Sequence, residues 1–271
     1  RFTEGSGWGE CHDVSDRPNL VFLFADEMVY DCMGCVGNKI IETPNLDALA
    51  AGGMRFDRAY ANAPVCTPYR ACLFSGRYGS QTDTLKNGAA LPTDRQNLAE
   101  VLRDGGYSTH YVGKWHLGGG GQAFIPENLR RGFDTFTGYQ CYNDFVQNVV
   151  FFDQDGKSRR FSGHRTEATA DLAIERLEHL KDGESPFALF VSWQNPHYPM
   201  EPPADWAARY SGIEIPPRPN QDMSLDPFTS TYSPRSPRPV EEDPCYQCYG
   251  RDMARYMQLY YAMVSHLDEQ V

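Results

Sequence analysis

The sequence predicts an α/β fold with a mostly parallel sheet flanked by helices. Two observations support this prediction. Apolar runs of strand length, residues 19–25 (NLVFLFA) and 187–192, are continuous rather than alternating, which is typical of strands buried on both faces of a sheet. Segments with helical spacing of apolar residues lie between such runs, and alternation of strands with helices is the pattern of α/β proteins.

The elements can be placed in chain order. The strand at 19–25 ends at Asp26-Glu27, and Thr43-Pro44 begins a helix, with Thr as N-cap and Pro at the first helical position. Gly52-Gly53 ends that helix. The next expected elements are a strand at 54–59, a helix at about 94–104 capped by Thr93, a strand at 107–112, a helix at about 166–181 and a strand at 187–192.

Two segments interrupt this pattern. We expect residues 1–17 to form an irregular lead-in and residues 213–250, rich in Pro, Ser and Asp, to form a surface insertion. A helical stripe follows from Met253 to Val271, with no Gly, Asn or Pro to close it. An α/β sheet that stops inside an uncapped helix predicts that residues 1–271 are the N-terminal part of a domain truncated at its C-terminus.

The composition excludes several classes of protein. With 41% hydrophobic and 23% charged residues the chain can form a globular core, and a net charge of −11 argues against a nucleic-acid partner. A local basic cluster could still bind an anionic substrate. There is no apolar run near 18 residues, so we expect no membrane span. Arg1 begins no signal-peptide pattern, and we expect a periplasmic or secreted protein rather than a cytoplasmic one.

Eight cysteines include two Cys-x-x-Cys pairs, Cys32/Cys35 and Cys245/Cys248. A shared zinc site is the less favoured interpretation, because the pairs lie some 200 residues apart and structural zinc sites usually take each ligand pair from a short knuckle. A disulfide framework is also unexpected in a chain of this length with so few cysteines.

The first motif with chemical content is Cys66-Thr67-Pro68-Tyr69-Arg70. Pro68 suits the first turn of a helix, which leaves Cys66 at or just before the N-terminus, where unpaired N–H groups and the helix dipole favour an anion. Arg70 follows one turn later and can present its guanidinium to the same place. The alternative is a buried cysteine at an ordinary helix start.

The second motif spans residues 106–118 (GYSTHYVGKWHLG). A strand runs into a Gly-rich loop, continued at 118–121, which lets the backbone approach a ligand and places Lys114 and His116 on the same side. Open α/β sheets bind ligands at the C-terminal ends of their strands. The alternative is a solvated pair on the surface.

Together, in this order, Cys-x-Pro-x-Arg and Gly-Tyr-x-Thr…Gly-Lys-x-His resemble the two signatures of the type I, formylglycine-dependent sulfatases of the alkaline phosphatase superfamily. The resemblance runs from residue 18 to about 118 and returns at 131–134 and 195–197. It implies an alkaline-phosphatase-like fold, with residues 1–271 as the N-terminal part of the catalytic domain.

The resemblance also implies a mechanism. A maturation enzyme would oxidise Cys66 to formylglycine, whose hydrate is a geminal diol. One hydroxyl attacks sulfur and displaces the alcohol or amine, and the other is then deprotonated to expel sulfate. Arg70 would hold the diol, Lys114 would pair with the sulfate, and His116 would take the diol proton. His197 matches a histidine that contacts the sulfate or protonates the leaving group; its alternative is an ordinary loop histidine.

The implied metal site departs from the family pattern. Members usually carry two adjacent aspartates after the first strand, whereas this sequence has Asp26-Glu27. Oxygen ligands suit Ca²⁺ or Mg²⁺, with Cys66, once modified, as a third ligand, and the family's other ligands lie downstream of Val271. Because each group follows a predicted strand, we expect four residues to converge at the C-terminal edge of the sheet: Asp26, Cys66, Lys114 and His116.

Other readings stay open. The same superfamily contains formylglycine-dependent phosphonate monoester and phosphodiester hydrolases, and a non-catalytic anion-binding domain or an unmodified Cys66 thiolate are further alternatives. The substrate could be a carbohydrate sulfate, choline sulfate, an aryl sulfate or a sulfamate. Four residues are placed where a substrate loop would lie, or where a loop would pack its own side chains: Tyr139, Tyr142, Asn143 and Asp144.

Overall fold

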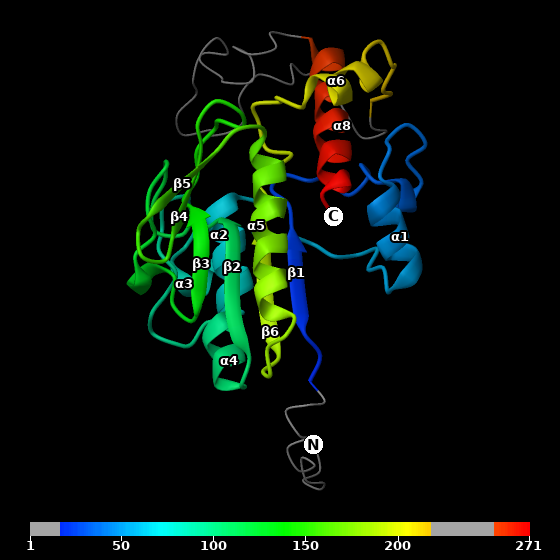
Figure 1. The fold of residues 1–271 in the computed structure, drawn as a ribbon. Coiled ribbons are helices and arrows are strands. Elements are labelled where there is room, and N and C mark those ends of the chain that lie inside the picture. Colours follow the sequence, from blue (N-terminus) through cyan, green and yellow to red (C-terminus); the bar gives the residue numbers. More distant parts are fainter. Residues whose placement is uncertain (1–16, 218–251) are drawn as a thin grey trace, which may run out of the picture.

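The structure is a computed structural model that describes residues 17–217 and 252–271. Residues 1–16 of the lead-in expected at 1–17, most of the Pro-rich insertion and the Cys245/Cys248 pair lie outside the described residues. Figure 1 shows a central sheet with helices on both sides. No helix in the described ranges is both long and apolar enough to cross a bilayer.

The sheet has six strands in the order β1-β6-β2-β3-β4-β5. Its first four strands pair in parallel, and β4 and β5 add an antiparallel edge. The mostly parallel α/β fold predicted from the sequence is therefore confirmed. The strand bounds are β1 Leu20–Phe24, β2 Ser108–Lys114, β3 Thr135–Tyr139, β4 Val149–Asp153, β5 Ser158–Phe161 and β6 Phe187–Ser192.

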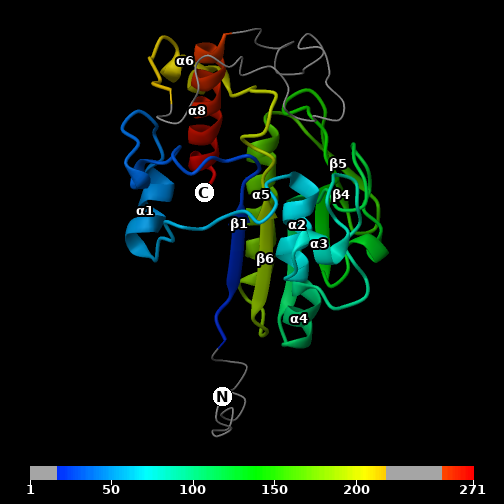
Figure 2. The same cartoon turned by 180° about the vertical axis from the view of Figure 1, so that it is seen from behind.

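Helices cover the two faces of the sheet differently. On the face toward the viewer in Figure 1, α5 (Arg165–Leu180) packs its small apolar residues against the sheet. On the other face, seen in Figure 2, α2 (Cys66–Ser75) and α4 (Leu98–Asp104) cover an aromatic core around Phe74 and Tyr111. The remaining described helices are α1 Pro44–Gly52, η2 Gly34–Val36, α3 Gly79–Thr82, η3 Glu127–Leu129, α6 Ala204–Tyr210 and α8 Met253–Glu269.

Three expectations about single elements were wrong. The first strand was expected to be buried on both faces, but β1 lies at the edge of the sheet and the side chains of Leu20–Leu23 are 38–48% exposed. Residues 54–59 form no strand; Met54 is 80% exposed there. The helix expected from about residue 94 begins at Leu98, because Asn97 caps it by accepting a hydrogen bond from the N–H of Glu100 at 3.1 Å.

The register brings three strand ends to one point. Phe24 of β1 and Gly113 of β2 both lie opposite Ser192 of β6. Gly113 has a φ of +108°, and a Cβ atom there would lie 2.1 Å from the carbonyl oxygen of Ser192. This glycine is therefore required for close packing of β2 on β6.

Candidate active site

Cys66 is the first residue of α2, as predicted. Its Sγ lies 3.5 Å from Oδ1 and 3.6 Å from Oδ2 of Asp26, which follows the end of β1. The start of the helix is tied to the loop after β2, because the Thr67 hydroxyl donates to the carbonyl oxygen of His116 at 2.6 Å. The helix N-terminus and the strand end thus present a sulfur atom and a carboxylate to the same space.

Arg70 links the three strand ends beneath Cys66. Its side chain is buried, and its Nη1 donates to the carbonyl oxygen of Lys114 at 2.7 Å and to Oγ of Ser192 at 2.9 Å. Its Nη2 lies 4.0 Å from Oδ1 of Asp26, and the guanidinium stands 5.1 Å from the ring of Phe24. Arg70 therefore places a fixed positive charge one helical turn below Cys66.

Lys114, the last residue of β2, supplies a second cation. Its fully buried ammonium donates to the carboxylate of Asp26 and lies 3.5 Å from Sγ of Cys66. Burial opposes ionisation of Asp26, but Lys114 and Arg70 outweigh it and hold the pKa of that carboxyl well below its usual range. Burial likewise opposes the charge of Lys114, and Asp26 raises the pKa of the lysine above its usual value.

His197 and Glu27 form a second contact beside this pair. His197 Nδ1 lies 2.6 Å from the carbonyl oxygen of Tyr198, which can only accept, so Nδ1 carries a proton. The other ring nitrogen, Nε2, lies 3.2 Å from Oε1 of Glu27. Burial and the charge of Asp26 raise the pKa of Glu27, and burial lowers the pKa of His197 to about 4. One shared proton between a neutral imidazole and the carboxyl accounts for this contact.

His116 belongs to the same cluster. The residue is 8% exposed, has a left-handed φ of +52°, and its Nδ1 is buried with no hydrogen-bond partner in the described residues. Burial, followed by the charges of Lys114 and Arg70, lowers its pKa to about 3. The imidazole is therefore neutral near pH 7 and able to accept a proton.

The predicted convergence of these groups at the C-terminal edge of the sheet is therefore what the structure shows. Among the described residues, one group offers ligand atoms for a metal within 4.8 Å of one another, namely Asp26, Cys66 and His197. The sequence suggested Asp26, Glu27 and Cys66 as ligands; Glu27 reaches the site through His197. Two adjacent carboxylates suit Ca²⁺ or Mg²⁺, and the soft Sγ stands where a modified Cys66 would present oxygen. The carboxylates at this site fit a hard divalent cation, whereas the sulfur and the imidazole as they stand do not.

The chain was compared with known proteins. The family model described as Sulfatase matches residues 18–271. The chain belongs to the sulfatase family. It is 34% identical over 192 residues to the ulvan-active sulfatase of Formosa agariphila, a match that covers 70% of this chain and 37% of that protein.

Two solved structures share the fold of this sulfatase chain. The crystal structure of yidJ from Bacteroides fragilis superposes with a TM-score of 0.74 at 27% identity, over 93% of this chain and 56% of the other. The phosphonate monoester hydrolase of Agrobacterium radiobacter superposes with a TM-score of 0.66 at 21% identity, over 94% and 57% of the two chains, which is evidence of a shared fold alone. The chain covers 37% of the ulvan-active sulfatase and 56–57% of the two solved structures, so it spans about half the length of its relatives or less.

Two residues of the candidate active site could not be found from sequence. Tyr260 of α8 holds the backbone of Glu27, since its hydroxyl donates to the Glu27 carbonyl oxygen at 2.7 Å and accepts from the N–H of Val29 at 2.9 Å. This contact supports the left-handed φ of +62° at Glu27. Arg165, at the start of α5, is 1% exposed, and its positive charge acts on His197. No motif marks either residue, because each acts through a contact between distant segments.

The side chains of the loop expected to contact substrate make their contacts within the protein itself. Tyr139 is fully buried, and the guanidinium of Arg165 lies 4.9 Å from its ring and 4.3 Å from that of Tyr142. Asn143 accepts a hydrogen bond from Gln194 at 3.1 Å. Asp144 accepts from three backbone N–H groups that follow it, at 2.9–3.3 Å. These contacts support the reading in which the loop packs its own side chains.

Proposed function

We propose that this chain carries the catalytic centre of a sulfuric ester hydrolase that acts through a formylglycine made from Cys66. The observation that carries the proposal is the meeting of Cys66 Sγ with the carboxylate of Asp26 and the ammonium of Lys114, at 3.5–3.6 Å from the sulfur, at a helix N-terminus. A nucleophile placed between cations and a helix N-terminus suits attack on an anionic ester.

The proposed role of each residue follows from its charge. Arg70 and Lys114 are buried cations that neutralise the sulfate oxygens as negative charge develops on them. Neutral His116 accepts the proton that a hydroxyl of the modified Cys66 must lose. His197, which shares a proton with Glu27, is placed to protonate the departing oxygen.

Asp26 and Glu27, with the modified Cys66, would hold the divalent metal. A bound Ca²⁺ or Mg²⁺ adds a fixed positive charge to the site. Burial raises the pKa of the Cys66 thiol to about 11 even though Lys114 lies beside it, so an unmodified thiolate nucleophile is not favoured near pH 7.

Mass spectrometry tests the modification directly. After co-expression with a formylglycine-generating enzyme, the peptide that contains Cys66 should lose about 18 Da, the change from thiol to aldehyde. Trypsin cleavage after Arg70 separates Cys66 from Cys72, a buried cysteine of the same helix, whose peptide is the internal control. A Cys66 peptide of unchanged mass under these conditions would show that the proposal is wrong.

Thermal unfolding tests the metal. Added Ca²⁺ should raise the melting temperature of the chain, because a ligand that binds only the folded state stabilises it. Asp26→Asn should abolish this shift, whereas Asp57→Asn, at an exposed position paired with Arg55, should retain it. An equal Ca²⁺ response in both variants would contradict a site at Asp26.

The substrate proposed is a sulfate ester on a carbohydrate, supported by the likeness to a sulfatase named for activity on ulvan. The alternative is a phosphonate monoester or phosphodiester hydrolase, supported by the shared fold alone. Parallel assays with an aryl sulfate and an aryl phosphonate monoester separate the two functions. A matured protein that binds sulfate and hydrolyses neither would favour an anion-binding role. We propose a periplasmic or secreted location for the protein.

A further inference from the structure

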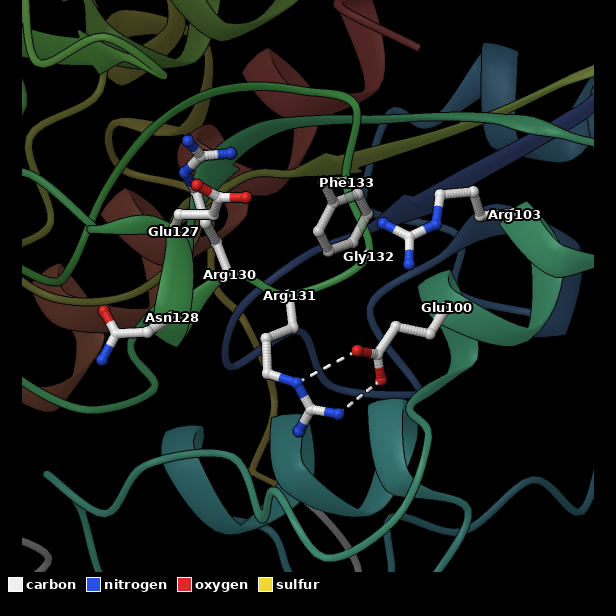
Figure 3. A pocket seen from close by; sticks show the side chains of 8 residues that line it. All are labelled: Glu100, Arg103, Glu127, Asn128, Arg130, Arg131, Gly132 and Phe133. Atoms are coloured by element: carbon white, nitrogen blue, oxygen red, sulfur yellow. Dashed lines mark hydrogen bonds and ion pairs between the residues drawn. The ribbon is translucent and has the colours of Figure 1, made fainter.

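A cavity of about 600 Å³ lies far from Cys66, between α4, η3 and the loop that leads into β3 (Figure 3). This loop and the turn after α4 precede β3 and β2, so the cavity is at the amino ends of these strands. The candidate active site is at their carboxyl ends. Because β2 has seven residues and a strand rises about 3.3 Å per residue, the two sites are separated by roughly 20 Å.

The lining of this cavity is positive within an acidic protein. Three arginines and two glutamates line it, a net charge of +1, whereas the whole chain carries −11. One pair is already satisfied: Arg131 donates to both carboxylate oxygens of Glu100, at 3.0 and 2.8 Å, as the dashed lines in Figure 3 show. The cationic groups left for a ligand are Arg103 and Arg130.

Arg130 is a buried cation that forms no ion pair with the described residues; burial lowers its pKa, and the negative charge of Glu127 opposes that shift only in part. The residue is 8% exposed, and no carboxylate of the described residues lies within 4.0 Å of its guanidinium. One nitrogen, Nη2, donates to the carbonyl oxygen of Gln154 at 3.1 Å, while Nε is buried with no partner. Burying a charge in this way is costly, and the cost is reduced when an anion binds beside it.

Arg103 provides an unengaged cation on the other side. It is exposed on α4, and its side chain makes no hydrogen bond or ion pair with any described residue. Figure 3 shows its guanidinium extending from α4 toward Gly132 and Phe133. A planar guanidinium with free donors matches the geometry of a carboxylate or sulfate.

The walls of the cavity are held in place before any ligand binds. Gly132 has a φ of +90°, and a Cβ atom there would lie 2.5 Å from the backbone nitrogen of Glu100, so only glycine lets the loop lie this close to α4. The side-chain amide of Asn97 donates to the carbonyl oxygen of Arg131 at 3.0 Å. The same loop is also clamped by the ion pair between Arg131 and Glu100. The loop that forms one wall of the cavity is therefore fixed against α4.

We propose that this cavity binds a small hydroxylated organic anion, such as a sulfated or carboxylated sugar unit, through Arg103 and Arg130. Its volume lies in the range of about 300–1,000 Å³ that small-molecule sites occupy. Glu127 and Asn128 are exposed at its margin and can bond to hydroxyl groups. None of these residues belongs to the candidate active site, so the proposal is independent of the proposed function.

Amide chemical shifts can test the proposal site by site. Glucose 6-sulfate and glucuronate are titrated separately into the ¹⁵N-labelled protein, and each should cause saturable shifts at Gly132 and Phe133. Shifts at Thr67 report the candidate active site. Arg103→Gln should weaken binding at the cavity at least about tenfold, the effect of losing one charge-assisted contact. Arg58→Gln, an exposed arginine elsewhere, should leave the affinity unchanged.

Several outcomes would overturn the proposal. These are no saturable shift at Gly132 and Phe133 with either sugar, equal affinity in wild type and Arg103→Gln, or binding of inorganic sulfate as tight as that of the sugars. Arg130→Gln provides a second test at the buried cation, with the spectrum itself as the check of folding. Since Arg103 is exposed on a helix surface, its variant keeps the proposal falsifiable even if Arg130→Gln does not fold.

Discussion

Replacing Lys114 with Met removes the buried cation on which Asp26 depends. Lys114 is fully buried and the side chain of Asp26 is 10% exposed, so water cannot take over the role of the ammonium. Methionine has a similar length and keeps the space filled. After the substitution, the nearest cation to Asp26 is Arg70, with Nη2 at 4.0 Å.

The expected loss of stability follows from this geometry. Removing one partner of a buried ion pair costs about 3–5 kcal/mol, and because Arg70 remains we expect the lower end, about 3 kcal/mol. For a chain of this size that lowers the melting temperature by roughly 6–12 °C. Because the pKa of Asp26 is lowered in the folded state, its contribution to stability is present above about pH 4 and is lost as the pH falls further. The difference between wild type and variant should therefore shrink in acid.

Urea unfolding with EDTA present measures this cost without a metal at Asp26. In an Asp26→Asn background the Lys114→Met substitution should cost much less, giving a coupling of about 2 kcal/mol. Lys157→Met is the matched control, because Lys157 pairs with Asp155 at 2.7 Å but the two side chains are 80% and 49% exposed. Its cost should be far smaller, because water screens an exposed ion pair. Equal costs for the two lysines, or no coupling to Asp26, would refute the reasoning.

Three further predictions concern other parts of the chain. Gly113→Ala should cost about 3 kcal/mol or more, because the new Cβ meets the Ser192 carbonyl 2.1 Å away at a left-handed φ. His164 caps α5, and burial lowers its pKa to about 3. The wild-type free energy of unfolding should therefore fall as the pH drops from about 6.5 toward 3. His164→Asn should reduce the slope of this pH dependence by roughly 1 kcal/mol per pH unit. Val21→Lys, on the exposed edge strand β1, should reduce self-association measured by light scattering.

Each of these predictions has a matched control. Gly37→Ala introduces the same left-handed strain, at φ +103° with nothing within 4 Å, and an equal cost there would show that the clash at Ser192 is unimportant. His179→Asn, at an exposed position of α5, should leave the pH profile as it is. Val101→Lys changes a valine of similar exposure, 52% against 48%, on a helix instead of a strand edge. Equal gains in solubility from both valine changes would contradict the edge-strand argument.

The amino-acid sequence by itself determined most of the elements that carry the site. β6 spans the predicted residues, α2 starts at Cys66 as Pro68 indicated, and α1 spans the segment from Pro44 to Gly52. These elements were predictable because continuous apolar runs, a proline in the first turn and paired glycines act within a few residues. The convergence of Asp26 and Lys114 was predictable as well, since parallel strands end at one edge. Cys66 reaches the same edge from the N-terminus of α2, and not from the strand expected at residues 54–59, which does not form.

Only the tertiary structure decided how those residues are paired and what surrounds them. Glu27 was placed at the site, but its contact with His197 and its support by Tyr260 of α8 depend on segments some 170 and 230 residues away. The exposure of β1 was not predictable, because an apolar run does not encode whether its strand is central or at an edge. The need for glycine at position 113 also depends on β6, because a Cβ atom there would meet the carbonyl oxygen of Ser192. Burial and long-range contacts, which local patterns do not specify, set the charges of this site.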